Sequence, residues 1–130
     1  GPRFMLVDLP GYGFAKVPER IRELWGPLIE EYFRNRKNLD GVVMLVDSRR
    51  VQDSDLAMVE WLMQLQIPMV VVATKADKVT RGKRHAAVRE LRKGLGMEED
   101  PLFLSAYTGE GKQEVLDHVR DLLALKTSPQ

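Results

Sequence analysis

The sequence predicts an α/β protein with a largely parallel sheet that helices cover on both faces. Two observations predict this class. Short, uninterrupted apolar runs alternate along the chain with longer amphipathic segments, and each apolar run ends at a polar residue. At 130 residues, with 44% hydrophobic and 30% charged residues, the chain suits one compact domain, which we expect to span residues 1–130.

Strand-then-helix units follow one another along the chain. The expected strands are Phe4–Val7, Val42–Val46, Met69–Ala73 and Leu102–Leu104. The expected helices carry apolar residues at three- and four-residue spacing over Pro18–Arg36, Leu56–Leu65, Ala87–Leu95 and Val115–Leu123. Asp53 or Ser54 suits the N-cap of the second helix, and Gly94 or Gly96 suits the end of the third. We expect the tail, residues 126–130, to fray.

Charge and composition exclude several classes of protein. Lys and Arg number 20 against 19 Asp and Glu, so the net charge of +1 gives no argument for a nucleic-acid or membrane partner. The chain has no cysteine, which excludes a disulfide framework and thiolate zinc and fits the cytoplasm, where we expect the protein. Its apolar runs are too short to span a bilayer, and we expect no membrane partner.

Ligands of such sheets bind beyond the carboxyl ends of the strands, so the polar strand ends are the candidate sites. The first expected strand runs into Asp8-Leu9-Pro10-Gly11. An Asp at a strand tip can hold Mg²⁺ through water, and the following Gly lets a backbone N–H approach a phosphate. A strand that simply ends in a Pro-Gly turn explains the same residues without a ligand.

Two further strand ends carry patterns that suit a purine base. Thr74-Lys75-Ala76-Asp77 follows a buried run, and its last carboxylate could accept two N–H bonds from guanine while the Lys75 stem covers the ring. Ser105-Ala106-Tyr107 follows the next run, and the N–H groups of Ser105 and Ala106 could reach a purine carbonyl oxygen. The alternative for each segment is a solvated loop with chance charges.

The order of these motifs resembles the third, fourth and fifth signature motifs of Ras-like GTPases of the translation-factor class. The string from Asp8 to Val17 is similar to the EngB/YsxC/YihA family of bacterial ribosome-assembly GTPases. Further similar segments are Trp25 with Glu31-Tyr32, Val46–Arg50 and Glu60–Leu62. The resemblance covers about Phe4 to Leu123 and implies a three-layer α/β/α sandwich of the P-loop GTPase type.

The resemblance also implies a site and a function. Asp8 would face Mg²⁺ through water, and the Gly11 amide would meet the γ-phosphate. The guanine base of GTP or GDP would be held by Thr74, Lys75, Ala76 and Asp77, and the pocket closed by Ser105, Ala106 and Tyr107. The whole protein would act as a GTP/GDP switch in assembly of the large ribosomal subunit, needed for normal cell division and septation. An aromatic residue, Tyr12, follows the Asp-x-x-Gly motif, so slow unassisted hydrolysis is expected.

The 130 residues depart from the family in one respect: they contain no Gly-x-x-x-x-Gly-Lys-Ser/Thr motif. Relative to the family, the first strand, the phosphate loop and the first helix are absent, and we expect this chain alone to bind triphosphate poorly. An unseen segment, re-pairing of the first strand, or a second copy of the chain would complete the sheet. The alternative function is a non-catalytic fragment or degenerate paralogue that acts through RNA or protein contacts.

Basic residues gather in one part of the chain although the whole is near neutral. The candidates for an RNA-binding patch are Lys78, Arg81, Lys83, Arg84, Arg89, Arg92 and Lys93. The resemblance suggests ribosomal RNA as their partner, and a solvated helix face is the equal alternative. A phospho-acceptor signalling domain would need an acidic pair near the first strand, which the sequence lacks. His85 and His118 lie too far apart for a helix-face metal pair.

Overall fold

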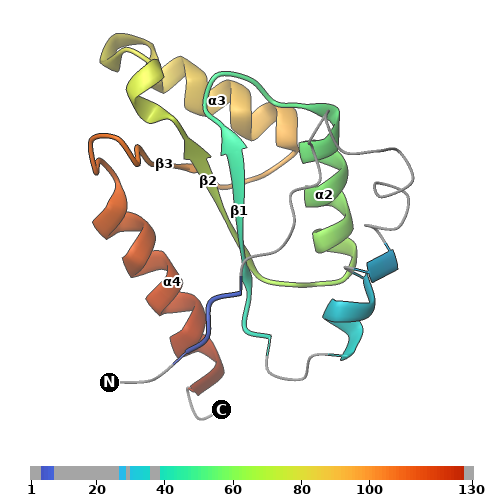
Figure 1. Ribbon diagram of the computed structural model, residues 1–130. Helices are drawn as coiled ribbons and strands as arrows, with labels where there is room; N and C mark the ends of the chain where they lie inside the picture. Colours follow the sequence, from blue (N-terminus) through green and yellow to red (C-terminus); the bar gives the residue numbers. More distant parts are fainter. Residues whose placement is uncertain (1–3, 8–26, 29, 36–38, 128–130) are drawn as a thin grey trace. The chain divides into compact units, whose positions relative to one another are not determined.

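A computed structural model of the chain describes residues 4–7, 27–28, 30–35 and 39–127, and Figure 1 draws the other residues as a thin grey trace. The chain divides into two units, Gly1–Asn38 and Leu39–Gln130, which are described separately. In the first unit, residues 27–28 and 30–35 are helical, in agreement with part of the helix expected over 18–36. The rest of that expected helix lies outside the described residues.

The expected strand over Phe4–Val7 is wrong. Residues 4–7 adopt no regular secondary structure, and their side chains are exposed. A strand is stable only when a neighbour accepts and donates its backbone hydrogen bonds. Apolar sequence alone therefore does not make this segment a strand.

The second unit contains a three-stranded parallel sheet in the order β1-β2-β3. Its elements are β1 (Val42–Asp47), α2 (Asp53–Gln64), β2 (Met69–Thr74), η1 (Ala76–Lys78), η2 (Arg81–Lys83), α3 (Arg84–Leu95), β3 (Leu102–Phe103) and α4 (Lys112–Thr127). The register pairs Asp47 of β1 with Thr74 of β2, and Ala73 with Phe103 of β3. The carboxyl ends of all three strands therefore meet at one edge of the sheet.

Helices cover the sheet on both faces, as expected. α2 and α3 contact each other, α4 packs against β2, and Figure 1 shows α4 on the opposite side of the sheet from α2 and α3. The core consists of buried residues from β1, β2, α2 and α3: Met44, Val46, Val70, Val71, Val72, Ala73, Val59, Leu62, Leu91 and Leu95. The three-layer α/β/α class is confirmed. None of the helices among the described residues is long and apolar enough to cross a membrane.

The helix ends differ in detail from the expectation. The N-cap of α2 is Gln52, not Asp53 or Ser54, because its backbone N–H donates to the Asp55 carboxylate at 2.9 Å in a capping arrangement. α3 ends at Gly96, one of the two expected glycines, in the left-handed conformation that favours glycine. α4 extends through Thr127, and the rest of the tail that we expected to fray lies outside the described residues.

Candidate functional site

The candidate site is formed by the loops that follow β1, β2 and β3. Parallel pairing brings these loops to the same edge of the sheet, which is where ligands of open α/β sheets bind. The structure describes these candidate residues: Thr74, Lys75, Ala76, Asp77, Ser105, Ala106 and Tyr107. The other candidates, Asp8, Leu9, Pro10 and Gly11, lie outside the described residues.

The loop after β2 is held in an unusual backbone conformation. Lys75 has φ 59° and ψ 38°, a left-handed conformation that is rare outside glycine. The Ser48 hydroxyl donates to the Lys75 carbonyl oxygen at 3.1 Å, and the Ala76 N–H donates to the Leu104 carbonyl oxygen at 3.1 Å. Because Ala76 is fully buried between them, the side chains of Lys75 and Asp77 both extend into solvent.

A hydrogen bond connects the loops after β2 and β3. The hydroxyl of Ser105, which is fully buried, donates to Oδ1 of Asp77 at 2.8 Å. This bond holds the pKa of the Asp77 carboxyl below its usual value, so the group is ionised at neutral pH. Oδ2 of Asp77 accepts no hydrogen bond from another residue in the described part of the chain, and it is therefore available to a ligand.

The loop after β3 is closed by its own backbone. The Ser105 N–H donates to the Glu110 carbonyl oxygen at 3.0 Å, and the Gly109 N–H donates to the Ser105 carbonyl oxygen at 2.8 Å. The Ser105 N–H is therefore occupied, whereas the Ala106 N–H has no partner within the residues described. Of the two amides expected to meet a purine carbonyl, only that of Ala106 is free to do so. Tyr107 is 90% exposed.

Gly111 fixes the path of this loop next to β3. It has φ +83°, and a Cβ at this position would overlap the Phe103 carbonyl oxygen. Gly109 has a similar φ of +82° but no heavy atom within reach of such a Cβ. The close approach of the loop to β3 therefore requires glycine at position 111 in particular.

The carboxylate at the end of β1, Asp47, takes part in the same edge of the sheet although its sequence pattern predicted no role for it. Asp47 accepts hydrogen bonds from Arg49 Nε at 2.9 Å and from Arg49 Nη2 at 2.8 Å, and Lys75 Nζ lies 3.5 Å from Asp47 Oδ2. The Arg49 hydrogen bonds hold the pKa of the Asp47 carboxyl well below its usual range. The available signal was a polar strand end with an arginine two residues further on, in the loop after β1 at the same edge of the sheet.

Two of the candidate RNA-binding residues have structural partners instead. The Arg84 guanidinium pairs with Glu110, donates to the Ala76 carbonyl oxygen at 3.1 Å and lies 5.6 Å from the centre of the Phe103 ring. Arg92 pairs with Asp100 at 3.1 Å. Arg84 is only 18% exposed, so it offers RNA much less surface than the exposed cations of the same segment.

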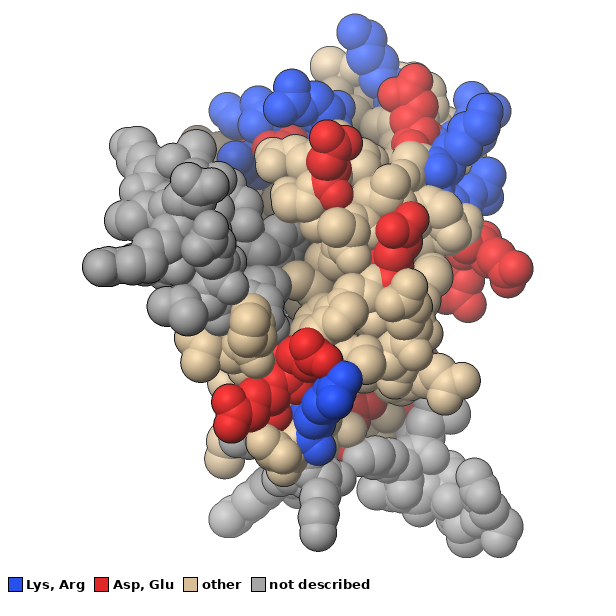
Figure 2. Space-filling view, turned by 90° about the vertical axis from the view of Figure 1, so that its right-hand side faces the viewer, with Lys and Arg blue, Asp and Glu red and all other residues tan. Residues whose placement is uncertain are grey.

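The other basic candidates are free. Their side chains are exposed and form no ion pair within the described part of the chain: Lys78, Arg81, Lys83, Arg89 and Lys93. Figure 2 shows Lys and Arg side chains gathered along the upper part of the face that it presents. Among the residues described, no group of His, Cys, Asp or Glu could hold a metal ion, and the expected Mg²⁺ contact rests on Asp8.

Comparisons with known proteins give consistent matches. The family described as Elongation factor Tu GTP binding domain matches residues 28–124. A protein of Halothermothrix orenii named Probable GTP-binding protein EngB is 47% identical over 125 residues, which cover 93% of this chain and 63% of that protein. A protein of Pelotomaculum thermopropionicum with the same name is 49% identical over 117 residues, covering 88% and 59%. The chain thus spans about three fifths of the length of these relatives.

A solved structure supports the fold. The crystal structure of a probable GTP-binding protein engB matches with a TM-score of 0.77 over 90% of this chain and 76% of that chain. The sequence identity in this match is 21%, so the match shows a shared fold and nothing finer.

Proposed function

The chain belongs to the Elongation factor Tu GTP-binding domain family and to the EngB GTP-binding proteins, and from this premise we propose that it recognises the guanine base of GTP or GDP. The base would lie between the loops that follow β2 and β3. The hydrogen bond from Ser105 to Asp77 is the observation that carries the proposal, because it fixes an ionised carboxylate at that position.

Each loop residue has a distinct role in this proposal. The Asp77 carboxylate accepts the N1 and N2 hydrogens of guanine, which adenine does not offer. The methylenes of Lys75 cover one face of the ring, and the Ala106 N–H donates to the guanine carbonyl oxygen. Thr74 acts indirectly, because its hydroxyl donates to the Val46 carbonyl oxygen at 3.1 Å and so ties the end of β2 to β1.

The phosphate end of the nucleotide is assigned by family membership alone. In this proposal Asp8 holds Mg²⁺ through water and the Gly11 amide meets the γ-phosphate, with Leu9 and Pro10 between them. Hydrolysis of GTP by the whole protein is part of the same proposal. Because Tyr12 has no amide with which to orient a water molecule, unassisted hydrolysis would be slow.

The proposed cellular role is a GTP/GDP switch in assembly of the large ribosomal subunit, in the cytoplasm. The exposed cations Lys78, Arg81, Lys83, Arg89 and Lys93 support contact with ribosomal RNA, because phosphate contacts dominate affinity for nucleic acid. A requirement for normal cell division and septation comes from family resemblance. In the alternative role, the chain acts without hydrolysis, through RNA or protein contacts alone.

Base recognition is testable with a nucleotide titration followed by amide NMR. Guanosine monophosphate should shift the amide signals of Lys75, Asp77 and Ala106, and adenosine monophosphate should not. In Asp77→Asn the preference should pass from guanosine to xanthosine monophosphate, because an amide can donate to the xanthine oxygen. Equal shifts with the guanine and adenine nucleotides would remove these loops from base recognition.

Calorimetry tests how much of the affinity depends on phosphate contacts. The 130-residue chain should show no saturable binding of GTP at millimolar nucleotide, because base contacts alone do not outweigh an association cost of about 4–15 kcal/mol. The NMR shifts above should accordingly grow with nucleotide concentration without reaching a plateau. Micromolar, Mg²⁺-dependent binding would contradict the proposed division between base and phosphate contacts.

A second copy of the chain at the free edge of β1 is a further proposal about partners. Within the described residues β1 pairs only with β2, and Leu45 on β1 is 58% exposed. Unpaired strand edges and exposed apolar residues favour association. Light scattering should then show a dimer that Leu45→Lys disrupts, whereas a monomer at all concentrations would exclude pairing of this kind.

A further inference from the structure

Arg84, the first residue of α3, contacts both loops of the candidate base site. Its Nη2 donates to the Ala76 carbonyl oxygen at 3.1 Å, and its Nε donates to the Val79 carbonyl oxygen at 3.4 Å. These two carbonyl groups stand on either side of Asp77 along the loop after β2. Nη1 of the same guanidinium pairs with the carboxylate of Glu110, which belongs to the loop after β3. A single side chain from α3 therefore connects the two loops.

The contact with Glu110 leads to the residue that holds the Asp77 carboxylate. The Glu110 carbonyl oxygen accepts a hydrogen bond from the Ser105 N–H at 3.0 Å, and the Ser105 hydroxyl donates to Asp77. A closed ring of contacts therefore runs from Arg84 through Glu110 and Ser105. It reaches Asp77 and returns to Arg84 through the backbone at Ala76. Because the ring is closed, the spacing of the two loops is fixed at two points.

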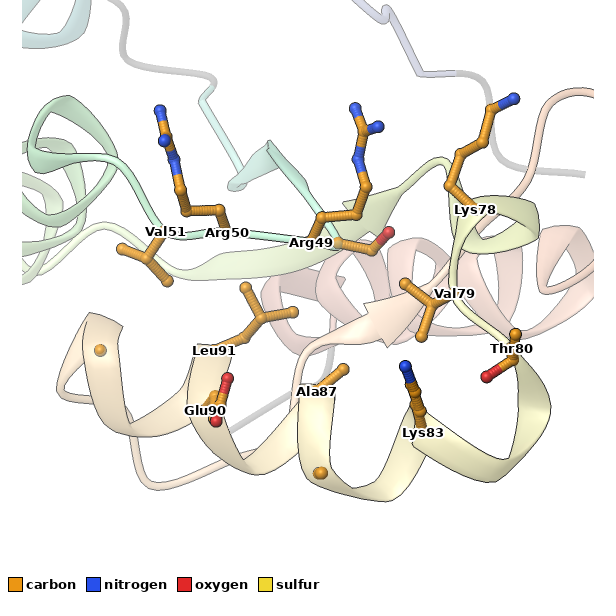
Figure 3. Close-up of a pocket in the computed structure, with 13 residues that line it drawn as sticks. Arg49, Arg50, Val51, Lys78, Val79, Thr80, Lys83, Ala87, Glu90 and Leu91 are labelled. Carbon is orange, nitrogen blue, oxygen red and sulfur yellow. The ribbon is translucent and has the colours of Figure 1, made fainter.

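The turn that carries Asp77 rests on the beginning of α3. Figure 3 shows the Val79 side chain directed toward α3 and the Lys78 side chain directed away from it. The Arg84 side chain is 18% exposed, and its guanidinium carbon lies 5.6 Å from the centre of the Phe103 ring. Solvent screens partly buried charges less than exposed ones, so this guanidinium holds the turn more strongly than an exposed arginine would.

The position of Arg84 is unfavourable for the helix alone. The first turn of a helix attracts acidic side chains and repels cations, and α3 has no acidic residue in its first turn. The stabilisation of this cation therefore comes from the two loops rather than from the helix. Such a placement favours a role for Arg84 in the arrangement of the loops.

We propose that Arg84 is a positioning residue for guanine recognition, which holds the Asp77 carboxylate and the Ala106 N–H at the spacing that the base requires. The inference rests on the proposed function, because that function assigns the base to these two groups. Arg84 itself does not touch the nucleotide. Its guanidinium presents several donors in one rigid plane, so a lysine can pair with Glu110 but cannot reach both backbone carbonyls at the same time.

Amide NMR of the 130-residue chain with guanosine monophosphate tests the proposal. At equal nucleotide concentration, the shift of the Ala106 amide should fall about threefold or more in Arg84→Met, because the loops must then be ordered when the base binds. The preference over adenosine monophosphate should shrink. Arg84→Lys should lose the response to a similar extent, and it provides the same test if Arg84→Met does not fold.

The pKa of the Asp77 carboxyl gives a second readout that needs no nucleotide. The Ser105 hydrogen bond is the main cause that lowers this pKa, and the charges of Lys78 and Arg49 lower it further. In both Arg84 variants the pKa should rise toward its ordinary value, because the displaced loops weaken the Ser105 bond. Arg84→Lys keeps the positive charge, so a rise in this variant reports a change of geometry rather than a lost charge. Carbon NMR during a pH titration measures it.

Two controls separate positioning from general loss of stability. Arg92→Met makes the same substitution on the same helix and removes an ion pair with Asp100, which lies outside the two loops. Val59→Ala removes a fully buried side chain from α2. Both controls should keep the guanosine shifts and the Asp77 pKa of the original chain.

The outcomes distinguish this inference from the proposed function. An unchanged guanosine response or an unchanged Asp77 pKa in the folded Arg84 variants would overturn the positioning role and leave guanine recognition in place. Equal losses in either control would also overturn it, because general loosening would then explain the effect. An original chain that responds equally to guanosine and adenosine monophosphate would instead overturn the proposed function. The Asp77 pKa would then still decide whether Arg84 sets the spacing of the loops.

Discussion

The Ser105 hydroxyl donates to Oδ1 of Asp77 at 2.8 Å, and so links two loops that are 28 residues apart in the sequence. The donor is fully buried while the acceptor is exposed. The bond therefore fixes the position of a carboxylate at the surface, because its donor is held in the core. A base-reading group needs this property, because its position must be set before the ligand arrives.

Removal of the Ser105 hydroxyl should change the ionisation of Asp77. In Ser105→Ala the carboxyl loses the hydrogen bond that stabilises its charged form, so its pKa should rise toward the ordinary value. Carbon NMR of the Asp77 carboxyl during a pH titration measures the change. Thr108→Ala is the control, because the Thr108 hydroxyl accepts a hydrogen bond from the Glu110 N–H and does not touch Asp77. An unchanged pKa in Ser105→Ala would mean that another contact holds the carboxylate.

The carboxylate of Asp47 should contribute to stability at neutral pH and lose that contribution in acid. Its pKa in the folded chain is depressed, chiefly by hydrogen bonds from Arg49. A depressed pKa favours the folded state above the unfolded value of about 3.9, and this stabilisation disappears as pH falls from there through the folded pKa. The free energy of unfolding, measured with urea, should therefore fall below about pH 4.

Two variants isolate this contribution. Asp47→Asn removes the titrating group and Arg49→Gln removes its main partner, so each should reduce the decline in stability below about pH 4. The effect should be modest, because Arg49 is exposed and solvent screens the pair. If both variants lost stability in acid as steeply as the original chain, other carboxylates would be responsible.

Arg84 and Arg89 both lie on α3 but should respond differently to substitution by Met. Arg84→Met loses contacts to Glu110, Ala76 and Phe103, so we expect a loss of about 2 kcal/mol in the free energy of unfolding. Arg89→Met should change stability by less than about 0.5 kcal/mol, because the side chain is exposed. Urea unfolding measures both.

In RNA binding, Arg89→Met should have the larger effect and Arg84→Met the smaller. Arg89→Met should weaken binding of an RNA oligonucleotide and reduce its dependence on salt, whereas folded Arg84→Met should bind as the original chain does. Fluorescence anisotropy at several salt concentrations measures both effects. A loss of RNA affinity in Arg84→Met alone would contradict the structural role of this arginine.

The sequence predicted the three strands of the second unit and the position of the candidate base residues at one edge of their sheet, because both depend on local pattern. Buried parallel strands are continuous apolar runs, and polar residues directly after Met69–Ala73 and Leu102–Leu104 must lie at one edge of the sheet. Lys75 and Asp77 were therefore placed by the position of their strand alone. The sequence did not predict that Ser105 contributes its hydroxyl while its N–H is occupied, because both depend on how its own loop closes.

The features that sequence reasoning missed depend on contacts between distant residues. In the sequence, Arg84 is one more cation in a basic segment. Its ion pair with Glu110, 26 residues further on, shows that it has a structural role. Phe4–Val7 is as apolar as a strand, but pairing requires a neighbour that the pattern does not supply. Hydrophobic periodicity predicts which residues can be buried, whereas pairing partners come from tertiary structure.

The left-handed conformation of Lys75 provides the last prediction. A residue with a Cβ pays about 1 kcal/mol for this conformation and glycine does not, so Lys75→Gly should be more stable than Lys75→Ala by about that amount. The Ser48 hydrogen bond to the Lys75 carbonyl holds the same backbone in the original chain and in both variants, since it does not involve the side chain of residue 75.

Both variants lack the methylenes proposed to cover guanine, so both should lose the amide shifts that guanosine monophosphate causes. Urea unfolding and the NMR titration together separate the two effects. Stability should depend on the backbone conformation at position 75, and base recognition should depend on the side chain there. Equal stability of the two variants would mean that the loop leaves the left-handed conformation once the lysine is gone, and that the side chain itself holds the backbone in place.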